Sequence, residues 1–254
     1  MICGGGHVST ALVRMAKLLD FEIWVLEDRP FFAEHAKQEG ADHILCGDYV
    51  ESLAKIPKDV DNYYVCMTRG HRFDLECLKE IYKRTFAYAG MMGSRKRSVL
   101  VRKDLEEAGY TKEQVQKLHS PIGLAIGAQT PAEIAVSIVA EIIQKKNESP
   151  EIINTLEEEI LKGLEDEKSK VLVTVIEKKG SSPRGEGTKM IVREDGKIYG
   201  TIGGGAVEHE AIEEAKNFDA ENGFLIKDYD LSNAKAATLG MVCGGQVKVM
   251  FERL

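Results

Sequence analysis

The chain has 254 residues, a length that accommodates two modest domains. Its formal net charge of −7 argues against a nucleic-acid partner, because binding to phosphate backbones requires a basic surface. No apolar run reaches the roughly 18 residues of a membrane span, and the first residues lack signal-peptide features. The five cysteines form no Cys-x-x-Cys pair, which argues against a disulfide framework or zinc knuckle and predicts a cytoplasmic protein.

Residues 1–147 alternate short apolar strands with helical segments. Continuous apolar runs are typical of a parallel sheet that is covered on both faces, so this part predicts a doubly wound, Rossmann-like α/β domain. The first strand is very short, and we therefore expect either that the native chain begins upstream of Met1 or that the C-terminal strand lies beside it. The expected strands are Met1–Cys3, Phe21–Leu26, His43–Cys46, Asn62–Thr68 and Phe86–Met92.

Residues 148–254 predict a smaller α+β domain with a leading linker helix. Ser149 and Pro150 mark the start of that helix, whose apolar stripe runs from Ile152 to Leu164. An Asp-Gly pair at positions 195 and 196 indicates a tight hairpin between two strands. The other expected elements are the strands Val171–Ile176, Lys189–Arg193 and Gly245–Leu254 and the helix Ala206–Lys216.

A glycine run in the second domain predicts an anion site. Glycines that open onto a helix leave backbone N–H groups unpaired, and the helix dipole adds positive potential. Arg184, on a nearby loop, would add a bidentate clamp, although the same glycines also suit tight turns. The candidate binding residues are Ser181, Ser182, Arg184, Gly203, Gly204, Gly205 and Glu208.

The first strand leads into a second glycine loop, Gly4–Ser9, which fits the pattern G-x-G-x-x-G except for Ser9 in the third glycine position. An acidic pair about twenty residues further on would accept hydrogen bonds from a ribose hydroxyl. This spacing predicts NAD(P) or another nucleotide, and the alternative is a dinucleotide fold that binds nothing. The candidate residues are Gly4, Gly6, His7, Ser9, Glu27 and Asp28.

A third candidate, Gly93, Ser94 and Arg95, follows the strand that ends at Met92, on the edge where α/β sheets bind ligands. Ser94 alternatively serves only as a helix cap. His71 also lies on the ligand side or is a surface residue, whereas His43 and His119 are expected to be structural.

Among the cysteines, only Cys243 is a candidate functional thiol. It precedes Gly244 and Gly245, so little side-chain bulk shields it and backbone N–H groups would lower its pKa. A thiolate there would contact a soft metal centre through a bound cofactor or carry sulfur; the alternative is a buried turn residue. The remaining expectation is that Cys46, Cys66 and Cys77 are small core residues.

Several longer motifs resemble the xanthine dehydrogenase accessory factor family of the XdhC/CoxI type, over nearly the whole chain. The family usually places the domain with the GSSPR motif first, so the order here is reversed. The matching motifs are CGGGHVSTAL (3–12), LEDRPFFAE (26–34), YAGMMGSRKR (88–97), PIGLAIGAQTPAEIAVSIVAEI (121–142), GSSPR (180–184), GTIGGGAVE (200–208) and GMVCGG (240–245).

The resemblance implies a maturation factor rather than an enzyme. Such a factor binds the molybdenum cofactor, a molybdopterin that also occurs as a dinucleotide, and assists its sulfuration and insertion. The implied partners are the apoenzyme of a molybdenum hydroxylase (xanthine, aldehyde or carbon monoxide dehydrogenase) and a cysteine desulfurase. The alternatives are an NAD(P)-dependent oxidoreductase, against which the lack of any Tyr-x-x-x-Lys pair counts, or a nucleotide-sensing regulator. The reversed domain order and the short first strand predict a homodimer.

Overall fold

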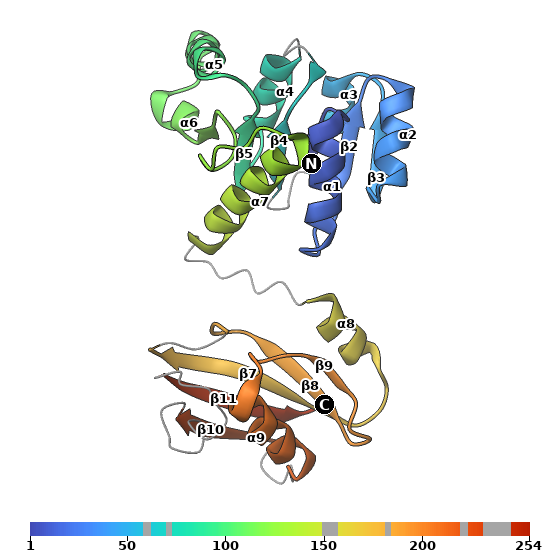
Figure 1. The fold of residues 1–254 in the computed structure, drawn as a ribbon, viewed down its shortest axis with the longest axis vertical. Helices are drawn as coiled ribbons and strands as arrows, with labels where there is room; N and C mark the ends of the chain where they lie inside the picture. Colours follow the sequence, from blue (N-terminus) through green and yellow to red (C-terminus); the bar gives the residue numbers. More distant parts are fainter. Residues whose placement is uncertain (58–61, 70–72, 149–156, 181–183, 219–222, 231–244) are drawn as a thin grey trace. The chain divides into compact units, whose positions relative to one another are not determined.

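The computed structural model describes residues 1–57, 62–69, 73–148, 157–180, 184–218, 223–230 and 245–254. The chain forms two compact units, Met1–Ile152 and Ile153–Leu254 (Figure 1). The predicted boundary, after residue 147, and this division both fall in or beside the undescribed stretch 149–156. Among the described residues, no helix has the length and apolar character needed to cross a membrane.

The first unit contains a six-stranded parallel sheet with the order β3-β2-β1-β4-β5-β6. This is the strand order of dinucleotide-binding folds. Successive strands are added toward one edge from β1 to β3 and toward the other edge from β4 to β6, so the order reverses between β1 and β4. The Rossmann-like prediction is confirmed, although β6 was not predicted. The strands are β1 (Ile2–Cys3), β2 (Trp24–Glu27), β3 (His43–Cys46), β4 (Tyr63–Cys66), β5 (Tyr88–Met91) and β6 (Leu118–His119).

Helices cover both faces of this sheet because successive strand residues point to opposite sides. In β1, Ile2 belongs to a core under α1, α2 and α7, and Cys3 to a core under α3, α4, α5 and α6. Two separate cores on one sheet are what its continuous apolar strands require. The helices are α1 (His7–Lys17), α2 (Pro30–Gln38), α3 (Tyr49–Ala54), α4 (Asp74–Ile81), α5 (Arg95–Glu107), α6 (Lys112–Gln116) and α7 (Pro131–Glu148).

The strand β3 corrects one prediction. It lies at the edge of the sheet, and Cys46 at its end is exposed rather than a core residue. His43, at its start, stacks on Trp24 with ring centroids 4.0 Å apart and contacts Glu22 at 2.8 Å. An edge strand has one neighbour instead of two, so its side chains meet solvent despite their apolar sequence.

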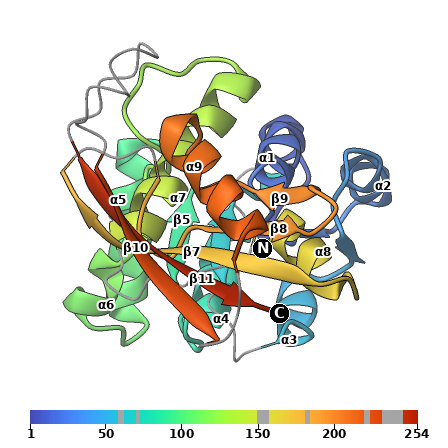
Figure 2. The same cartoon turned by 90° about the horizontal axis from the view of Figure 1, so that it is seen from below.

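The second unit is an antiparallel five-stranded sheet with the order β10-β11-β7-β8-β9. The C-terminal strand β11 pairs with β7 and β10, so it does not lie beside β1. The helix α9 covers one face of the sheet (Figures 1 and 2), whereas Gly163 of α8 lies against Ile191 on the other. The elements are α8 (Glu158–Glu165), β7 (Lys170–Lys179), β8 (Lys189–Arg193), β9 (Ile198–Gly200), α9 (Gly205–Lys216), β10 (Phe224–Asp230) and β11 (Gln246–Arg253).

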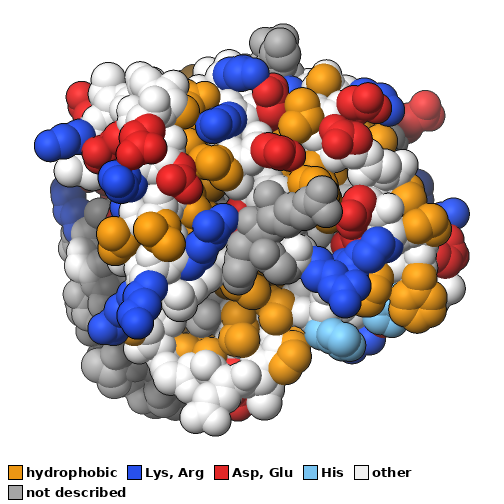
Figure 3. Space-filling model, turned by 90° about the horizontal axis from the view of Figure 1, so that it is seen from above, with side chains coloured by type: hydrophobic (Ala, Val, Ile, Leu, Met, Phe, Trp, Pro, Cys, Tyr) orange, Lys and Arg blue, Asp and Glu red, His pale blue; other side chains and the backbone are white. Residues whose placement is uncertain are grey.

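The smaller α+β domain is therefore confirmed. The Asp-Gly turn joins β8 to β9, with Gly196 at φ +85° and its N–H bonded to the Arg193 carbonyl at 2.9 Å. The strand β10 was not predicted. The helix α8 begins at Glu158, after the non-helical Glu157, so the predicted linker helix is wrong at residue 157; its residues 149–156 lie outside the described residues. On the face shown in Figure 3, basic and acidic side chains are intermixed in the upper half, and separate basic side chains lie below them.

The tightest backbone approach at the glycine loop of the first unit is at Gly4. Its φ is +112°, and a Cβ there would lie 2.4 Å from the Met67 carbonyl oxygen. We expect Gly4→Ala to destabilise the fold by at least about 2 kcal/mol in urea denaturation, because strain and a backbone clash add. The control is Gly6→Ala, since a Cβ there meets nothing within 4 Å. This control should lower the free energy of unfolding by less than about 1 kcal/mol. Equal losses in both variants would contradict the close packing of Gly4 against the Met67 carbonyl.

Candidate functional site

The loop Gly4–Ser9 lies where the strand order of the first sheet reverses. The Gly4 N–H donates to the Leu26 carbonyl of β2 at 2.8 Å, and the Met67 N–H donates to the Cys3 carbonyl at 2.9 Å. These bonds fix the loop between the ends of β2 and β4, directly before α1. In open α/β sheets, ligands bind outside the carboxyl ends of the strands at the point where the strand order reverses.

A buried carboxylate binds the backbone of this loop. Glu27, fully buried at the end of β2, accepts a hydrogen bond from the Gly5 N–H at 2.5 Å. Its two oxygens also accept from Arg29, at 2.7 Å from Nε, 3.1 Å from Nη2 and 3.1 Å from the backbone N–H. The Arg29 guanidinium in turn lies 4.0 Å from the centroid of the Phe32 ring. Because both oxygens are engaged, Glu27 anchors the loop.

The neighbouring acid, Asp28, is the more accessible of the predicted pair, with 37% of its side chain exposed. The Tyr49 hydroxyl donates to Asp28 Oδ1 at 3.3 Å. The pKa of Asp28 is lowered by its interaction with the neighbouring Glu27, by the hydrogen bond from Tyr49 and by the charge of Arg29. Asp28 is therefore a charged, exposed carboxylate at the position where a ribose hydroxyl is expected.

The other residues of the loop have different surroundings. His7 is exposed at the first position of α1, and open space faces Gly6. Ser9 is fully buried, and its hydroxyl has no hydrogen-bond partner among the described residues. Ser9 thus fills the helix–sheet contact that the third glycine of the motif normally occupies.

At the end of β5, Ser94 caps α5 by accepting a hydrogen bond from the Arg97 N–H at 3.2 Å. This is one of the two roles predicted for it. Arg95 is exposed at the first position of α5. Binding of a ligand by Gly93, Ser94 and Arg95 stays a prediction, and His71 lies outside the described residues.

The glycine loop of the second unit also contains an internal carboxylate. Three donors converge on Oε2 of Glu208: the Thr201 hydroxyl, the Ile202 N–H at 3.0 Å and the Gly204 N–H at 3.1 Å. The Gly203 N–H donates to Thr201 Oγ1 at 3.0 Å. Gly203, Gly204 and Gly205 all have positive φ, which favours glycine at each position. The N–H groups of Gly203 and Gly204, which the sequence predicts to be unpaired, are therefore bonded to the chain itself.

This donor set suits an anionic oxygen, because it already binds one. A Cβ at Gly204 would meet nothing within 4 Å, so a ligand can approach the loop closely. A phosphate oxygen would take the position of the Glu208 carboxylate. Arg184 does not point a free guanidinium at the loop: its Nη1 donates to Glu157 at 3.1 Å. Ser181, Ser182 and Cys243 lie outside the described residues.

A partly buried polar cluster that was not predicted anchors the loop before α7. Glu141 of α7 accepts hydrogen bonds from the Tyr88 hydroxyl and the Gly123 N–H, the latter at 2.9 Å, and contacts His119 Nδ1 at 3.3 Å. Burial by itself would raise the pKa of Glu141, but the hydrogen bonds from His119, Tyr88 and Gly123 outweigh it and lower that pKa. His119 stacks on Tyr88 with ring centroids 4.7 Å apart. Within the described parts of the chain, no three His, Cys, Asp or Glu side chains are arranged to hold a metal ion.

The two acids of the first unit give a direct test of the anchor. Glu27→Gln keeps an acceptor for Gly5 but removes the charge that pairs with Arg29, so we expect a loss of about 2–4 kcal/mol in the free energy of unfolding. Asp28→Asn, at the exposed neighbour, should change it by less than about 1 kcal/mol. Denaturant titration of both variants measures the difference, and a Glu27→Gln variant as stable as Asp28→Asn would refute the anchoring role.

Comparison with known proteins agrees with this architecture. Residues 1–142 match the family described as XdhC Rossmann domain, and residues 164–230 match the XdhC and CoxI family. The uncharacterized protein YqeB of Escherichia coli (strain K12) is 34% identical over 161 residues, which cover 59% of this chain and 28% of that protein. A Bacillus subtilis (strain 168) protein, named as a probable subunit of xanthine dehydrogenase, is 27% identical over 146 residues, covering 58% of this chain and 42% of that protein.

Among solved structures, a xanthine dehydrogenase from Bacillus halodurans superposes with a TM-score of 0.50 and 31% identity. The superposition covers 57% of this chain and 42% of that one. The matches span less than half the length of each of these relatives. Because the Rossmann-domain match alone extends over more than half of the sequence, the chain belongs to the XdhC family, with its Rossmann domain ahead of its XdhC and CoxI domain.

Proposed function

We propose that this chain is an accessory factor that binds the molybdenum cofactor and assists its sulfuration and insertion into a molybdenum hydroxylase. The observation that carries the proposal is the pairing of both family domains in one chain, together with a relative named as a probable xanthine dehydrogenase subunit. The partners would be the hydroxylase apoenzyme and a cysteine desulfurase. In this role the chain holds and transfers a cofactor and need not catalyse a reaction.

The glycine loop of the second unit supports the proposal. A molybdopterin carries a phosphate, and the convergent donors of Thr201, Ile202 and Gly204 suit one anionic oxygen of it. On binding, the phosphate would replace the Glu208 carboxylate. Because the carboxylate already orients these donors, the loop would have its binding conformation before the ligand is present. When bound, the cofactor would supply the molybdenum centre that the hydroxylase uses. Cys243, with Ser181 and Ser182, is proposed to contact the same ligand.

The first unit would bind the nucleotide part of a cofactor dinucleotide, or NAD(P). The pyrophosphate would lie against Gly4–Ser9 at the N-terminus of α1, where the space beside Gly6 is open. Asp28 would accept the ribose hydroxyl, because Glu27 already has four hydrogen bonds from Gly5 and Arg29. Because Arg29 pairs with Glu27, the Asp28 carboxylate contributes a negative charge at this position. This charge favours an unmodified ribose hydroxyl over a 2′-phosphate, which it would repel.

The strand order and this loop also support the second candidate, an NAD(P)-dependent oxidoreductase or nucleotide-sensing regulator. The two candidates differ in the ligand that copurifies, a pterin for the first and a nicotinamide or other nucleotide for the second. We further propose that the chain is a homodimer, in which a partner chain completes surfaces left by the reversed domain order. Light scattering at micromolar concentration distinguishes dimer from monomer.

Arg184 is the charged side chain proposed to clamp the cofactor phosphate. Arg184→Ala should weaken binding of isolated molybdenum cofactor by about 1.5–3 kcal/mol, the contribution of a charge-assisted hydrogen bond. The matched control is Glu157→Gln, which removes a negative charge beside Arg184 but leaves the guanidinium, and it should not weaken binding. Fluorescence titration of the pterin measures both affinities, and unchanged affinity in Arg184→Ala would remove Arg184 from the site.

For Cys243 the prediction separates function from folding. If this thiol contacts molybdenum or relays sulfur, Cys243→Ser should keep the melting temperature and abolish rescue of hydroxylase activity in cells that lack the factor. Cys46→Ser, at an exposed thiol on the edge strand β3, is the control and should rescue fully. Full rescue by Cys243→Ser would end the functional assignment of this cysteine.

A further inference from the structure

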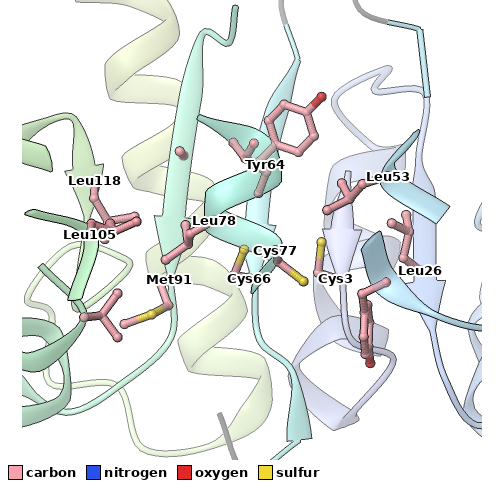
Figure 4. Close-up of a cluster of buried hydrophobic side chains, with 14 of the residues drawn as sticks. Cys3, Leu26, Leu53, Tyr64, Cys66, Cys77, Leu78, Met91, Leu105 and Leu118 are labelled. Carbon is pink, nitrogen blue, oxygen red and sulfur yellow. The ribbon is translucent and has the colours of Figure 1, made fainter. Parts of the chain in front are cut away.

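Three cysteines lie in one core of the first unit, next to the glycine loop Gly4–Ser9. Cys3 of β1 and Cys66 of β4 are direct neighbours in the register of the parallel sheet, and Cys77 belongs to α4, which covers this face. All three side chains are fully buried. Figure 4 shows their sulfur atoms gathered between the two strands and the helix, with Leu53 and Leu78 nearby. No part of the proposed cofactor role uses this cluster.

The three thiols interact with one another. Cys3 lies beside Cys66 and Cys77 in this core, and its interactions with the two thiols lower its pKa. The same contacts, with burial, raise the pKa of Cys66 and of Cys77. Asp74, buried at the start of α4 and bonded to the Thr68 hydroxyl at 2.7 Å, adds a negative charge that opposes ionisation of Cys3. Cys3, the direct strand neighbour of Cys66, is thus the member of the cluster whose thiol has a lowered pKa.

The register of the sheet brings the Cα atoms of Cys3 and Cys66 within the range found in disulfides. Neighbouring strands lie about 4.8 Å apart, within the range of about 4.4–6.8 Å between the Cα atoms of disulfides. We propose that the cluster is a redox-sensitive modification site, in which Cys3 forms a disulfide with one of its two neighbouring thiols and the third thiol stays free. The inference does not rest on the molybdenum role of the chain.

The oxidant would be a small disulfide of the glutathione type. The Cys3 thiolate attacks one sulfur of that disulfide, forms a mixed disulfide and releases one small thiolate. The second cysteine, as its thiolate, then attacks the Cys3 sulfur, forms the intramolecular bond and releases the second small thiol. Two cysteine thiols are oxidised and one small disulfide is reduced. Since the cluster is buried, exchange takes place during folding or through local opening of the unit.

The bond would fix the base of the candidate nucleotide loop. Cys3 directly precedes Gly4, and Gly4 packs against the Met67 carbonyl that follows Cys66. A covalent link from Cys3 would therefore hold the start of the loop to β4 or α4. Oxidation of the cluster would act on the loop without any oxidised residue touching a ligand.

The test uses the full chain with Cys46→Ala and Cys243→Ala, so that only the cluster can react. The protein is refolded in mixtures of reduced and oxidised glutathione, the folded fraction is isolated, and free thiols are alkylated before mass spectrometry and peptide mapping. We expect folded protein with one disulfide, which contains Cys3, and one alkylated thiol, in a proportion that rises with oxidised glutathione. Folded protein with three alkylated thiols at every ratio would overturn the proposal.

A variant locates the bond. Cys3→Ala in the same background should show no intramolecular disulfide at any glutathione ratio, whereas Cys66→Ala and Cys77→Ala should each retain one that includes Cys3. If Cys3→Ala does not fold, peptide mapping of the parent decides the assignment. A disulfide that joins Cys66 to Cys77 would refute the role given to Cys3.

Discussion

The two described glycine loops, Gly4–Ser9 and Gly203–Gly205, are each bound by a carboxylate of the chain itself. Glu27 binds the Gly5 N–H in the first unit, and Glu208 binds the Ile202 and Gly204 N–H groups in the second. Backbone donors that converge at a buried or half-buried position carry a cost if they stay unpaired. The two carboxylates remove that cost and keep the loops in shape, while the loops stay chemically suited to anions.

The two carboxylates differ in how easily a ligand could replace them. Glu27 is fully buried and also pairs with Arg29, so its displacement would take from that guanidinium the carboxylate that Nε and Nη2 both contact. Glu208 is only half-buried and forms no ion pair among the described residues, so an incoming phosphate competes with one side chain alone. From this contrast we infer that Glu27 permanently anchors its loop, whereas Glu208 can be replaced by a ligand phosphate. The contrast also explains why Asp28 is the acid left for a ribose in the first unit.

The longest family motif, residues 121–142, has a structural explanation. Gly123 has φ +93°, and a Cβ there would lie 2.4 Å from the Ser137 hydroxyl, so the loop packs directly on α7. Glu141 of α7 binds the Gly123 N–H and the Tyr88 hydroxyl. Gly90 leaves room for that hydroxyl, which lies 2.7 Å from the place where a Cβ would be. The motif therefore joins α7, β5 and the intervening loop into one packed arrangement.

Sequence patterns predicted the parts of the fold that depend on local periodicity. The apolar strands of the first unit, the hairpin at Gly196 and the helix after Gly204 all have local signals. Cys46 was misplaced because an apolar run does not reveal which strand lies at an edge. The strands β6 and β10 were missed because two residues, or a run of mixed polarity, carry no clear periodicity.

The candidate sites were predicted as loops, but their internal partners were not. Nothing in the spacing of Glu208 from Gly204 shows that its carboxylate turns back onto the loop. In the same way, Cys3, Cys66 and Cys77 lie far apart in the sequence, and only the register of β1 and β4 brings two of them together. Contacts of this kind depend on the tertiary arrangement, which sequence periodicity does not contain.

The central claim is that the chain carries molybdenum cofactor, and the ligand bound to the protein tests it most directly. Freshly purified protein from cells that make the cofactor would be denatured, and the released small molecules analysed by mass spectrometry and pterin fluorescence. The account predicts a molybdopterin or its dinucleotide in the wild type, and much less of it in Arg184→Ala. A nicotinamide dinucleotide as the only bound ligand, or folded protein that contains no pterin even after incubation with isolated cofactor, would contradict it.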